Sequence, residues 1–188
     1  MVTGAGLPSM YGLLGEARSH AERLFAFVSM DSLSAGAASE ALARPAVAAG
    51  VQWEEPALSE VFDATHGYPY FLQEYGKQTW RLAEGPERIT RDDVTAARPH
   101  VTEQLDDGFF SVRVGRTTKA EREYLKAMAS LGRGPYRSGA VARELHKSTR
   151  QVSTIRDSLI KRGLCFAPEH DVIDFTVPMF DAFARHKL

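Results

Sequence analysis

The sequence predicts a mainly α-helical fold with one short β-hairpin near its end. Apolar residues recur at three- to four-residue intervals along most of the chain, and Ser, Thr or Pro residues stand where these periodic segments begin. Near the C-terminus, a turn separates two short apolar runs. We therefore expect a small helical bundle followed by a winged helix-turn-helix with a short β-hairpin.

Residues 1–32 begin with the small, Gly-rich stretch MVTGAGLP, which is unusual as the start of an independent domain. From Met10 to Phe27, apolar residues gather on one side of a helical period. This predicts a helix, or a helix and a loop, because Gly12 and Gly15 weaken the early part. We expect the chain to begin in the middle of a larger structure.

Residues 33–107 are expected to form an all-helical bundle. The Ala-rich stretch 33–50 predicts two short helical pieces, because Pro45 interrupts it. Thr90 suits the N-cap of the last helix of the bundle, and Pro99 should kink that helix.

Two prolines mark helix starts inside the bundle. Pro56 and Pro69 each stand in the first turn of an apolar-periodic segment. Backbone N–H groups in a first turn have no partner within the helix, so proline, which has no N–H, is well suited to this position. Gly67 lies between them and suits the end of the first of these helices. Residues 109–114 alternate enough to predict a short extended linker after the bundle.

Residues 136–164 carry the pattern of two short helices joined by a polar turn. Ser138 suits the N-cap of the first helix, Ser148 or Thr149 that of the second, and Gly163 ends the second. The two apolar runs that follow predict the hairpin. Two helices followed by a hairpin make a winged helix-turn-helix, although many similar helix pairs bind nothing.

Further elements are expected around this helix pair. Thr118 opens a preceding helix, and residues 178–186 predict a final helix that packs Phe180 and Phe183 inward. The single cysteine, Cys165, falls in a predicted buried strand and has no partner for an internal disulfide. We expect it to be structural.

Charge divides the chain near Gly115. Residues 1–115 hold 9 Lys/Arg against 16 Asp/Glu, a net charge of −7, whereas 116–188 hold 14 against 8, a net charge of +6. We therefore expect three segments: 1–32, 33–115 and 116–188. The basic C-terminal segment suits contact with nucleic acid, and it equally suits docking on the acidic segment before it.

Composition and motifs exclude several classes of protein. The 188 residues are 44% hydrophobic and 25% charged, no apolar run approaches the roughly 20 residues of a membrane span, and no signal segment opens the chain. This predicts a cytoplasmic protein without a membrane partner. The sequence has no P-loop, no Gly-x-Ser-x-Gly elbow and no His pair with metal-ligand spacing, so we expect no catalytic residue and no metal site.

Residues 65–73, THGYPYFLQ, resemble the Gly-x-Pro signature in the helical lid of the STAND branch of AAA+ ATPases, particularly the archaeal-type ATPase family. Two earlier stretches agree with this. GAGLP at 4–8 is similar to the segment after that family's sensor-1 strand, and SHAERLFAF at 19–27 resembles the end of its nucleotide core. In such proteins a winged helix follows the lid.

The resemblance implies that Gly67 and Pro69 lie against a nucleotide base and report whether ATP or ADP is bound. Tyr68 and Tyr70 would be their neighbours, and Arg23 is a candidate for the arginine that reaches a phosphate. Without the resemblance, Gly67 is simply a glycine that ends one helix, and Pro69 is a proline in the first turn of the next.

The resemblance also implies what this chain lacks. The P-loop and the acidic Mg²⁺-holding strand of the family are missing from the sequence, so the chain alone should neither hydrolyse ATP nor hold a cofactor. It looks like the C-terminal regulatory segment of a STAND-type AAA+ ATPase, with 1–32 as a remnant of the core or a connector. ATP or ADP with Mg²⁺ would then bind the full-length parent, and the missing N-terminal core would be its partner.

The alternative is a free-standing winged-helix transcriptional regulator that binds duplex DNA. Because the second helix of a helix-turn-helix enters the major groove, its first turns should face bases and its later cations should meet phosphates. Acidic Glu169 and Asp171 at the wing tip oppose this, and a signalling partner protein is a further possibility for the winged helix. The candidate DNA-binding residues are Ser148, Thr149, Arg150, Gln151, Ser153, Arg156, Lys161 and Arg162.

Overall fold

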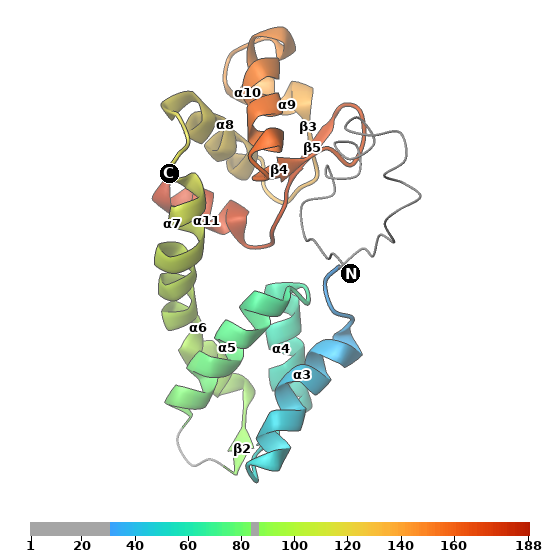
Figure 1. The fold of residues 1–188 in the computed structure, drawn as a ribbon, viewed down its shortest axis with the longest axis vertical. Helices are drawn as coiled ribbons and strands as arrows, with labels where there is room; N and C mark the ends of the chain where they lie inside the picture. The colour runs from blue at the N-terminus through green and yellow to red at the C-terminus, as the bar shows by residue number, and fades with distance from the viewer. Residues whose placement is uncertain (1–30, 84–86) are drawn as a thin grey trace, which may run out of the picture. The chain divides into compact units, whose positions relative to one another are not determined.

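A computed structural model describes residues 31–83 and 87–188 of the chain. The chain divides after Asp31, and Ser32–Leu188 forms one compact unit. Within the described residues the fold is mainly helical, as predicted (Figure 1). Arg23, the segment 10–27 and the two stretches that resemble an ATPase core lie outside the described residues.

The first half of the described chain is a helical bundle whose neighbouring helices pack on one another. Pro56 and Pro69 stand in the first turns of two of these helices, and Thr90 caps a third through a capping box with Asp93, which confirms all three predicted starts. The elements are α3 (Ala35–Ala48), β1 (Gln52–Trp53), α4 (Glu55–Thr65), α5 (Pro69–Leu82), β2 (Arg88–Ile89) and α6 (Arg91–Leu105). Two short parallel strands, which were not predicted, join the segment between α3 and α4 to the segment before α6.

Prolines do not divide these helices. α3 runs through Pro45 without interruption, so the prediction of two helical pieces is wrong. Leu42 and Ala46 flank Pro45 on the buried face, and their burial offsets the roughly 3 kcal/mol that an interior proline costs a helix. α6 likewise continues through Pro99.

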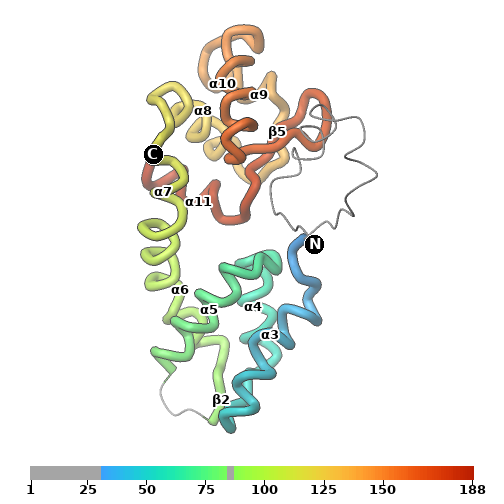
Figure 2. The backbone as a smooth tube through the Cα atoms, in the orientation of Figure 1, coloured from blue at the N-terminus to red at the C-terminus, as the bar shows by residue number. Residues whose placement is uncertain are grey.

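The segment predicted as an extended linker is helical. α6 passes directly into a π-helix, η1 (Asp106–Phe110), and then into α7 (Ser111–Val114), as the backbone trace shows (Figure 2). Phe110 and Val114 are both buried, so the apolar positions follow a helical face and not a strand's alternation. A π-turn contains one more residue than an α-turn and often marks a functional position.

The second half contains the predicted helix pair and hairpin. Ser148 and Gln151 form a capping box at the start of the second helix, and Gly163 ends it at φ +69°. The predicted N-cap of the first helix is wrong, because Ser138 is already its first residue and Arg137 occupies the cap. The elements are α8 (Lys119–Ser130), β3 (Tyr136–Arg137), α9 (Ser138–Glu144), α10 (Thr149–Lys161), β4 (Cys165–Phe166), β5 (Val172–Phe175) and α11 (Phe180–Lys187).

A three-stranded antiparallel sheet in the order β3-β5-β4 completes this half. Cys165 pairs with Phe175 across the hairpin and is buried, as predicted. β3 was not predicted, because two residues are too short to show a period.

Candidate functional site

The turn between α4 and α5 has a backbone geometry that requires glycine. Gly67 has φ +72°, and a Cβ there would overlap the carbonyl oxygen of Leu33. The N–H of Leu33 donates to the carbonyl oxygen of Gly67 at 2.9 Å, which holds the two segments together. Tyr68 is the N-cap of α5 and Pro69 is its first residue.

Aromatic side chains beside Pro69 connect this turn to the π-helix. The ring of Tyr70 stacks on that of Phe109 with centroids 5.1 Å apart, and Tyr68 meets the same ring edge-on at 6.3 Å. The guanidinium carbon of Arg113 lies 4.2 Å from the centre of the Phe109 ring. The candidate turn is therefore fixed to η1 by side-chain packing.

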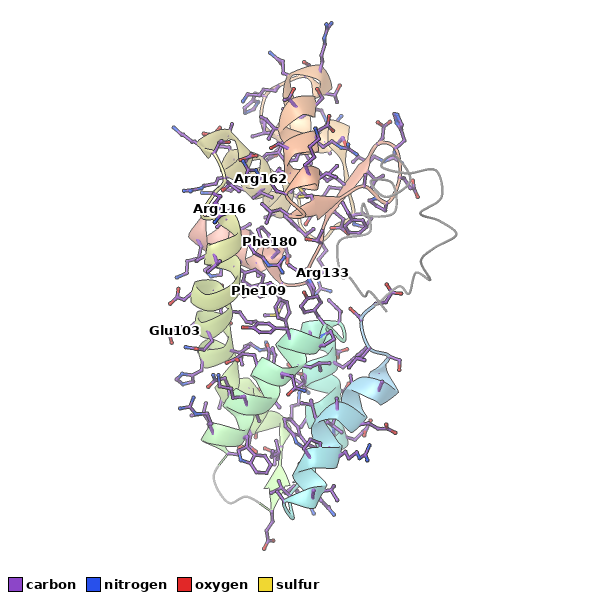
Figure 3. All side chains as sticks on the ribbon, viewed as in Figure 1. Glu103, Phe109, Arg116, Arg133, Arg162 and Phe180 are labelled. Carbon is purple, nitrogen blue, oxygen red and sulfur yellow. The ribbon has the colours of Figure 1, made fainter. Side chains whose placement is uncertain are left out.

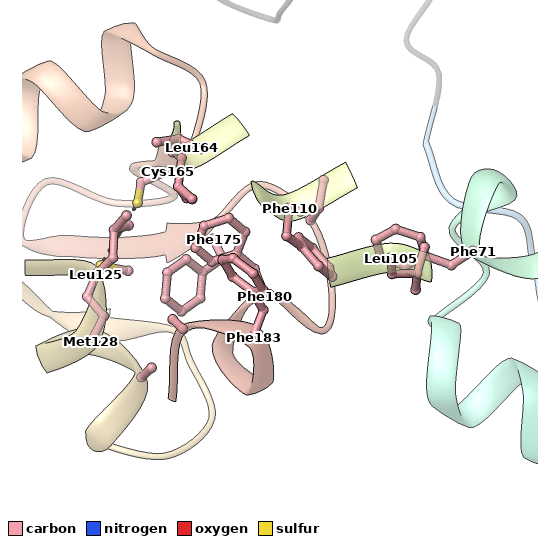
Figure 4. Close-up of a cluster of buried hydrophobic side chains, with 14 of the residues drawn as sticks. Phe71, Leu105, Phe110, Leu125, Met128, Leu164, Cys165, Phe175, Phe180 and Phe183 are labelled. Atoms are coloured by element: carbon pink, nitrogen blue, oxygen red, sulfur yellow. Dashed lines mark hydrogen bonds between the residues drawn. The ribbon is translucent and has the colours of Figure 1, made fainter. Parts of the chain in front are cut away.

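The next ring in the π-helix continues this packing to the C-terminal helix. Phe110 lies 5.6 Å from Phe71 of α5 and contacts Phe180 and Phe183 of α11 at 5.6 and 5.1 Å. Figure 4 shows Phe110 between the two α11 rings and Phe71, and Figure 3 labels Phe109 and Phe180. Aromatic pairs at these separations add about 0.5–1.5 kcal/mol each beyond burial. This connection was not predicted, although the adjacent aromatic pair Phe109–Phe110 is visible in the sequence.

A polar contact joins the same two elements. Asp106, the first residue of η1, is 3% exposed, and its carboxylate lies 2.6 Å from Nε2 of His186 in α11. The other ring nitrogen, Nδ1, lies 2.6 Å from the carbonyl oxygen of Ala182. Both ring nitrogens of His186 therefore face oxygen atoms, one on η1 and one on α11 itself, and the contact with Asp106 ties α11 to the start of η1.

A cleft of about 1070 Å³ lies within the unit 32–188. Its lining holds three arginines and four carboxylates, so its charges nearly balance and do not favour a polyanion such as a nucleotide. These charged residues are Arg98, Arg133, Arg185, Glu60, Asp63, Asp174 and Asp181.

The candidate DNA-binding residues of α10 divide into free and engaged groups. The side chains of Thr149, Arg150 and Lys161 are exposed and make no hydrogen bond or ion pair with the described residues. Ser148 and Gln151 are engaged with each other in the cap, and the hydroxyl of Ser153 donates to the carbonyl oxygen of Arg150 at 2.9 Å.

The two later arginines make structural contacts. Nη2 of Arg156 donates to the carbonyl oxygens of His170 and Val172 at 3.4 and 3.2 Å, so this side chain, 18% exposed, supports the hairpin. Nε of Arg162 donates to Glu121 at 3.0 Å. Their partners lie 14 to 41 residues away along the chain, which is why the sequence alone gave no sign of these contacts.

Glu121 of α8 is a buried carboxylate that fixes α10. It is 3% exposed and accepts hydrogen bonds from the hydroxyl of Ser158 at 2.6 Å, the N–H of Thr118 at 2.7 Å and the guanidinium of Arg162. Burial by itself raises the pKa of this carboxyl, but the hydrogen bonds outweigh burial and hold its pKa below the ordinary 4.5.

Replacing Glu121 by glutamine is expected to lower the free energy of unfolding at neutral pH by about 2 kcal/mol, because charge-assisted hydrogen bonds are lost. Because the pKa of Glu121 is lowered in the folded state, the native protein should be more stable than the variant above pH 4.5. This difference in the free energy of unfolding should disappear as the pH falls through the lowered pKa. Urea unfolding of both proteins across this range measures it. Glu123→Gln, on the exposed side of α8, should show neither effect, and a Glu121→Gln loss that persists at low pH would contradict the assignment.

A family profile and several solved structures are similar to this chain. The profile of a family described as "Domain of unknown function (DUF8462)" matches residues 107–184, and no curated protein matches the chain. Solved structures of RuvB from Thermotoga maritima are similar to the chain. The one described as a Holliday junction branch migration motor has 19% identity and a TM-score of 0.38, and a mutant of it has 18% identity and the same TM-score. Each alignment covers 77% of this chain and 47% of the RuvB chain, so this chain spans about half of that protein's length.

Membrane-spanning helices and metal-binding clusters are both absent from the described residues. No helix among them is long and apolar enough to cross a membrane. Within residues 31–83 and 87–188, no group of His, Cys, Asp and Glu side chains has the arrangement of a metal site.

Proposed function

We propose that this chain is the C-terminal regulatory segment of a STAND-type AAA+ ATPase. In this proposal the turn Gly67–Pro69 senses bound ATP or ADP with Mg²⁺, and residues 116–188 form a winged helix that responds. A core supplied by other residues holds the nucleotide phosphates. The observation that carries the proposal is the aromatic packing from Tyr70 through Phe109 and Phe110 to α11.

The turn offers one side of a nucleotide site. Tyr70 is 49% exposed, and Arg113 is the cation packed on its stacking partner Phe109. An exposed aromatic ring with one nearby cation suits contact with a base and is insufficient to neutralise a triphosphate. Nucleotide binding should therefore depend on the core domain as well as on this turn.

The rigidity of the turn explains how a small displacement would be transmitted. Because Gly67 lies against Leu33 and Pro69 has a fixed φ, the turn has little freedom to absorb a movement locally. Tyr68 and Tyr70 would instead move the ring of Phe109, and its neighbour Phe110 packs on α11. The coupling is thus a direct sequence of packed rings.

Pro69→Ala in the protein isolated from its source cells tests this proposal. We expect weaker binding of labelled ATP, by about tenfold, because loosening the first turn of α5 changes the position of the sensing residues. Pro56→Ala is the matched control, since it removes a first-turn proline from α4, and it should leave ATP binding unchanged. Equal ATP affinity in the native and Pro69→Ala proteins would contradict the proposal.

A further inference from the structure

Unpaired cations gather at the turn between α9 and α10. Arg143, Lys147 and Arg150 are exposed and make no ion pair among the described residues. Glu144, the acid of this stretch, accepts a hydrogen bond from the hydroxyl of Ser130 at 3.0 Å. Positive charge is therefore concentrated where the two helices meet.

The two helices bring these groups to one surface. The guanidinium of Arg143 and the methyl group of Thr149 lie 3.8 and 4.0 Å from the point where a Cβ on Gly139 would stand. The start of α10 thus lies beside α9, and the free N–H groups of its first turn add partial positive charge. All exposed side chains of α10 are polar: Thr149, Arg150, Gln151, Ser153, Thr154, Asp157 and Lys161.

The composition of this surface favours nucleic acid over a protein partner. Protein interfaces usually centre on apolar or aromatic side chains, whereas DNA-binding surfaces are polar and strongly positive. None of the described large apolar side chains that are exposed lies between Arg133 and Arg162. The hydroxyls of Thr149 and Thr154 are groups that commonly bind phosphate oxygens.

The hairpin has the opposite character. Glu169 and Asp171 are exposed at its tip, and Asp171 has 84% of its side chain accessible. Arg156, the cation nearest to it on α10, is engaged with the hairpin's carbonyl oxygens and with Asp157. A duplex approaching the hairpin tip would meet negative charge.

We propose that the α9–α10 turn, through Arg143, Lys147 and Arg150, binds the backbone of double-stranded DNA, with α10 in the major groove and the hairpin held away. Arg156 and Arg162 stabilise the fold and contact no phosphate. Three phosphate contacts predict a slope of about −3 for log K against log salt concentration. DNA binding here needs no nucleotide, so its failure would leave the proposed role of Gly67–Pro69 intact.

The test is a fluorescence anisotropy titration of the full chain with a random-sequence 20-base-pair duplex at several salt concentrations. The triple variant Arg143→Ala, Lys147→Ala and Arg150→Ala should lose at least about 30-fold in affinity and most of the salt slope. The matched control removes three other exposed cations, Arg116, Lys119 and Lys126, which make no ion pair with the part of the chain that the structure describes, and it should bind as the native chain does. Figure 3 labels Arg116.

Three results would overturn the proposal. They are no salt-dependent binding by the native chain, equal losses in the two triple variants, and equal affinity for a double-stranded RNA of the same length. A-form RNA has a major groove too narrow for a helix, so we expect at least about tenfold weaker binding to it. Arg150→Lys, which keeps the charge, should retain most of the affinity and so separates charge loss from misfolding.

Discussion

Gly67→Ala is expected to lower the free energy of unfolding by more than about 2 kcal/mol. Two effects add at this position. The left-handed backbone, φ +72°, is unfavourable for alanine, and the new methyl group would overlap the carbonyl oxygen of Leu33. Relieving the overlap would break the hydrogen bond from Leu33 to Gly67. Chemical denaturation followed by circular dichroism measures the loss.

Two other glycines separate these effects. Gly50 also has a positive φ, +80°, but open space around it, so Gly50→Ala should cost only about 1 kcal/mol. Gly36 lies in α3 with nothing near it, and Gly36→Ala should stabilise the helix by up to about 1 kcal/mol. Equal costs at Gly67 and Gly50 would show that the contact with Leu33 is unimportant.

Phe110→Ala is expected to cost about 3–5 kcal/mol of stability, because it removes a fully buried ring and leaves a cavity. The ring is 1% exposed and packs against Phe71, Phe109, Phe180 and Phe183. Calorimetric or urea unfolding measures this loss. A cost below about 1 kcal/mol would mean that the rings of α5 and α11 close the gap and that Phe110 is not a structural connection.

Phe166→Ala provides the matched control for ring removal. Phe166 is 44% exposed on β4, so the same substitution there should cost less than about 1 kcal/mol. Phe110→Leu keeps most of the volume and should retain the fold while it breaks the ring-to-ring packing. This variant therefore tests the coupling between the Gly67–Pro69 turn and α11 in a protein that is still folded.

Helix starts were the most predictable part of the fold. Thr90, Thr118 and Ser148 each form a capping box, and Pro69 begins α5, because these signals are local and act within four residues. The same local rules failed at Pro45, since the packing of the buried face of α3 outweighs the missing hydrogen bond. Local signals thus predicted most helix starts, with Ser138 as an exception, whereas the effect of an interior proline depended on packing that the local sequence does not show.

The candidate site was predictable only in part. The turn at Gly67 and Pro69 was visible as a motif, but its contact with Phe109 depends on a π-turn between residues 106 and 110 that no periodicity indicates. Similarly, Arg156 and Arg162 looked like phosphate-binding cations, and only the fold shows that carbonyl oxygens of the hairpin and Glu121 engage them. Contacts between segments that are distant in the sequence therefore determine which cationic side chains already have partners within the fold.

The most direct measurement is the mass and nucleotide binding of the protein isolated from its source cells with an antibody raised against residues 116–188. If this chain is the C-terminal segment of a larger ATPase, we expect a species far above the 20.7 kDa of this chain that retains labelled ATP in the presence of Mg²⁺. A species near 20.7 kDa that retains no nucleotide would contradict it.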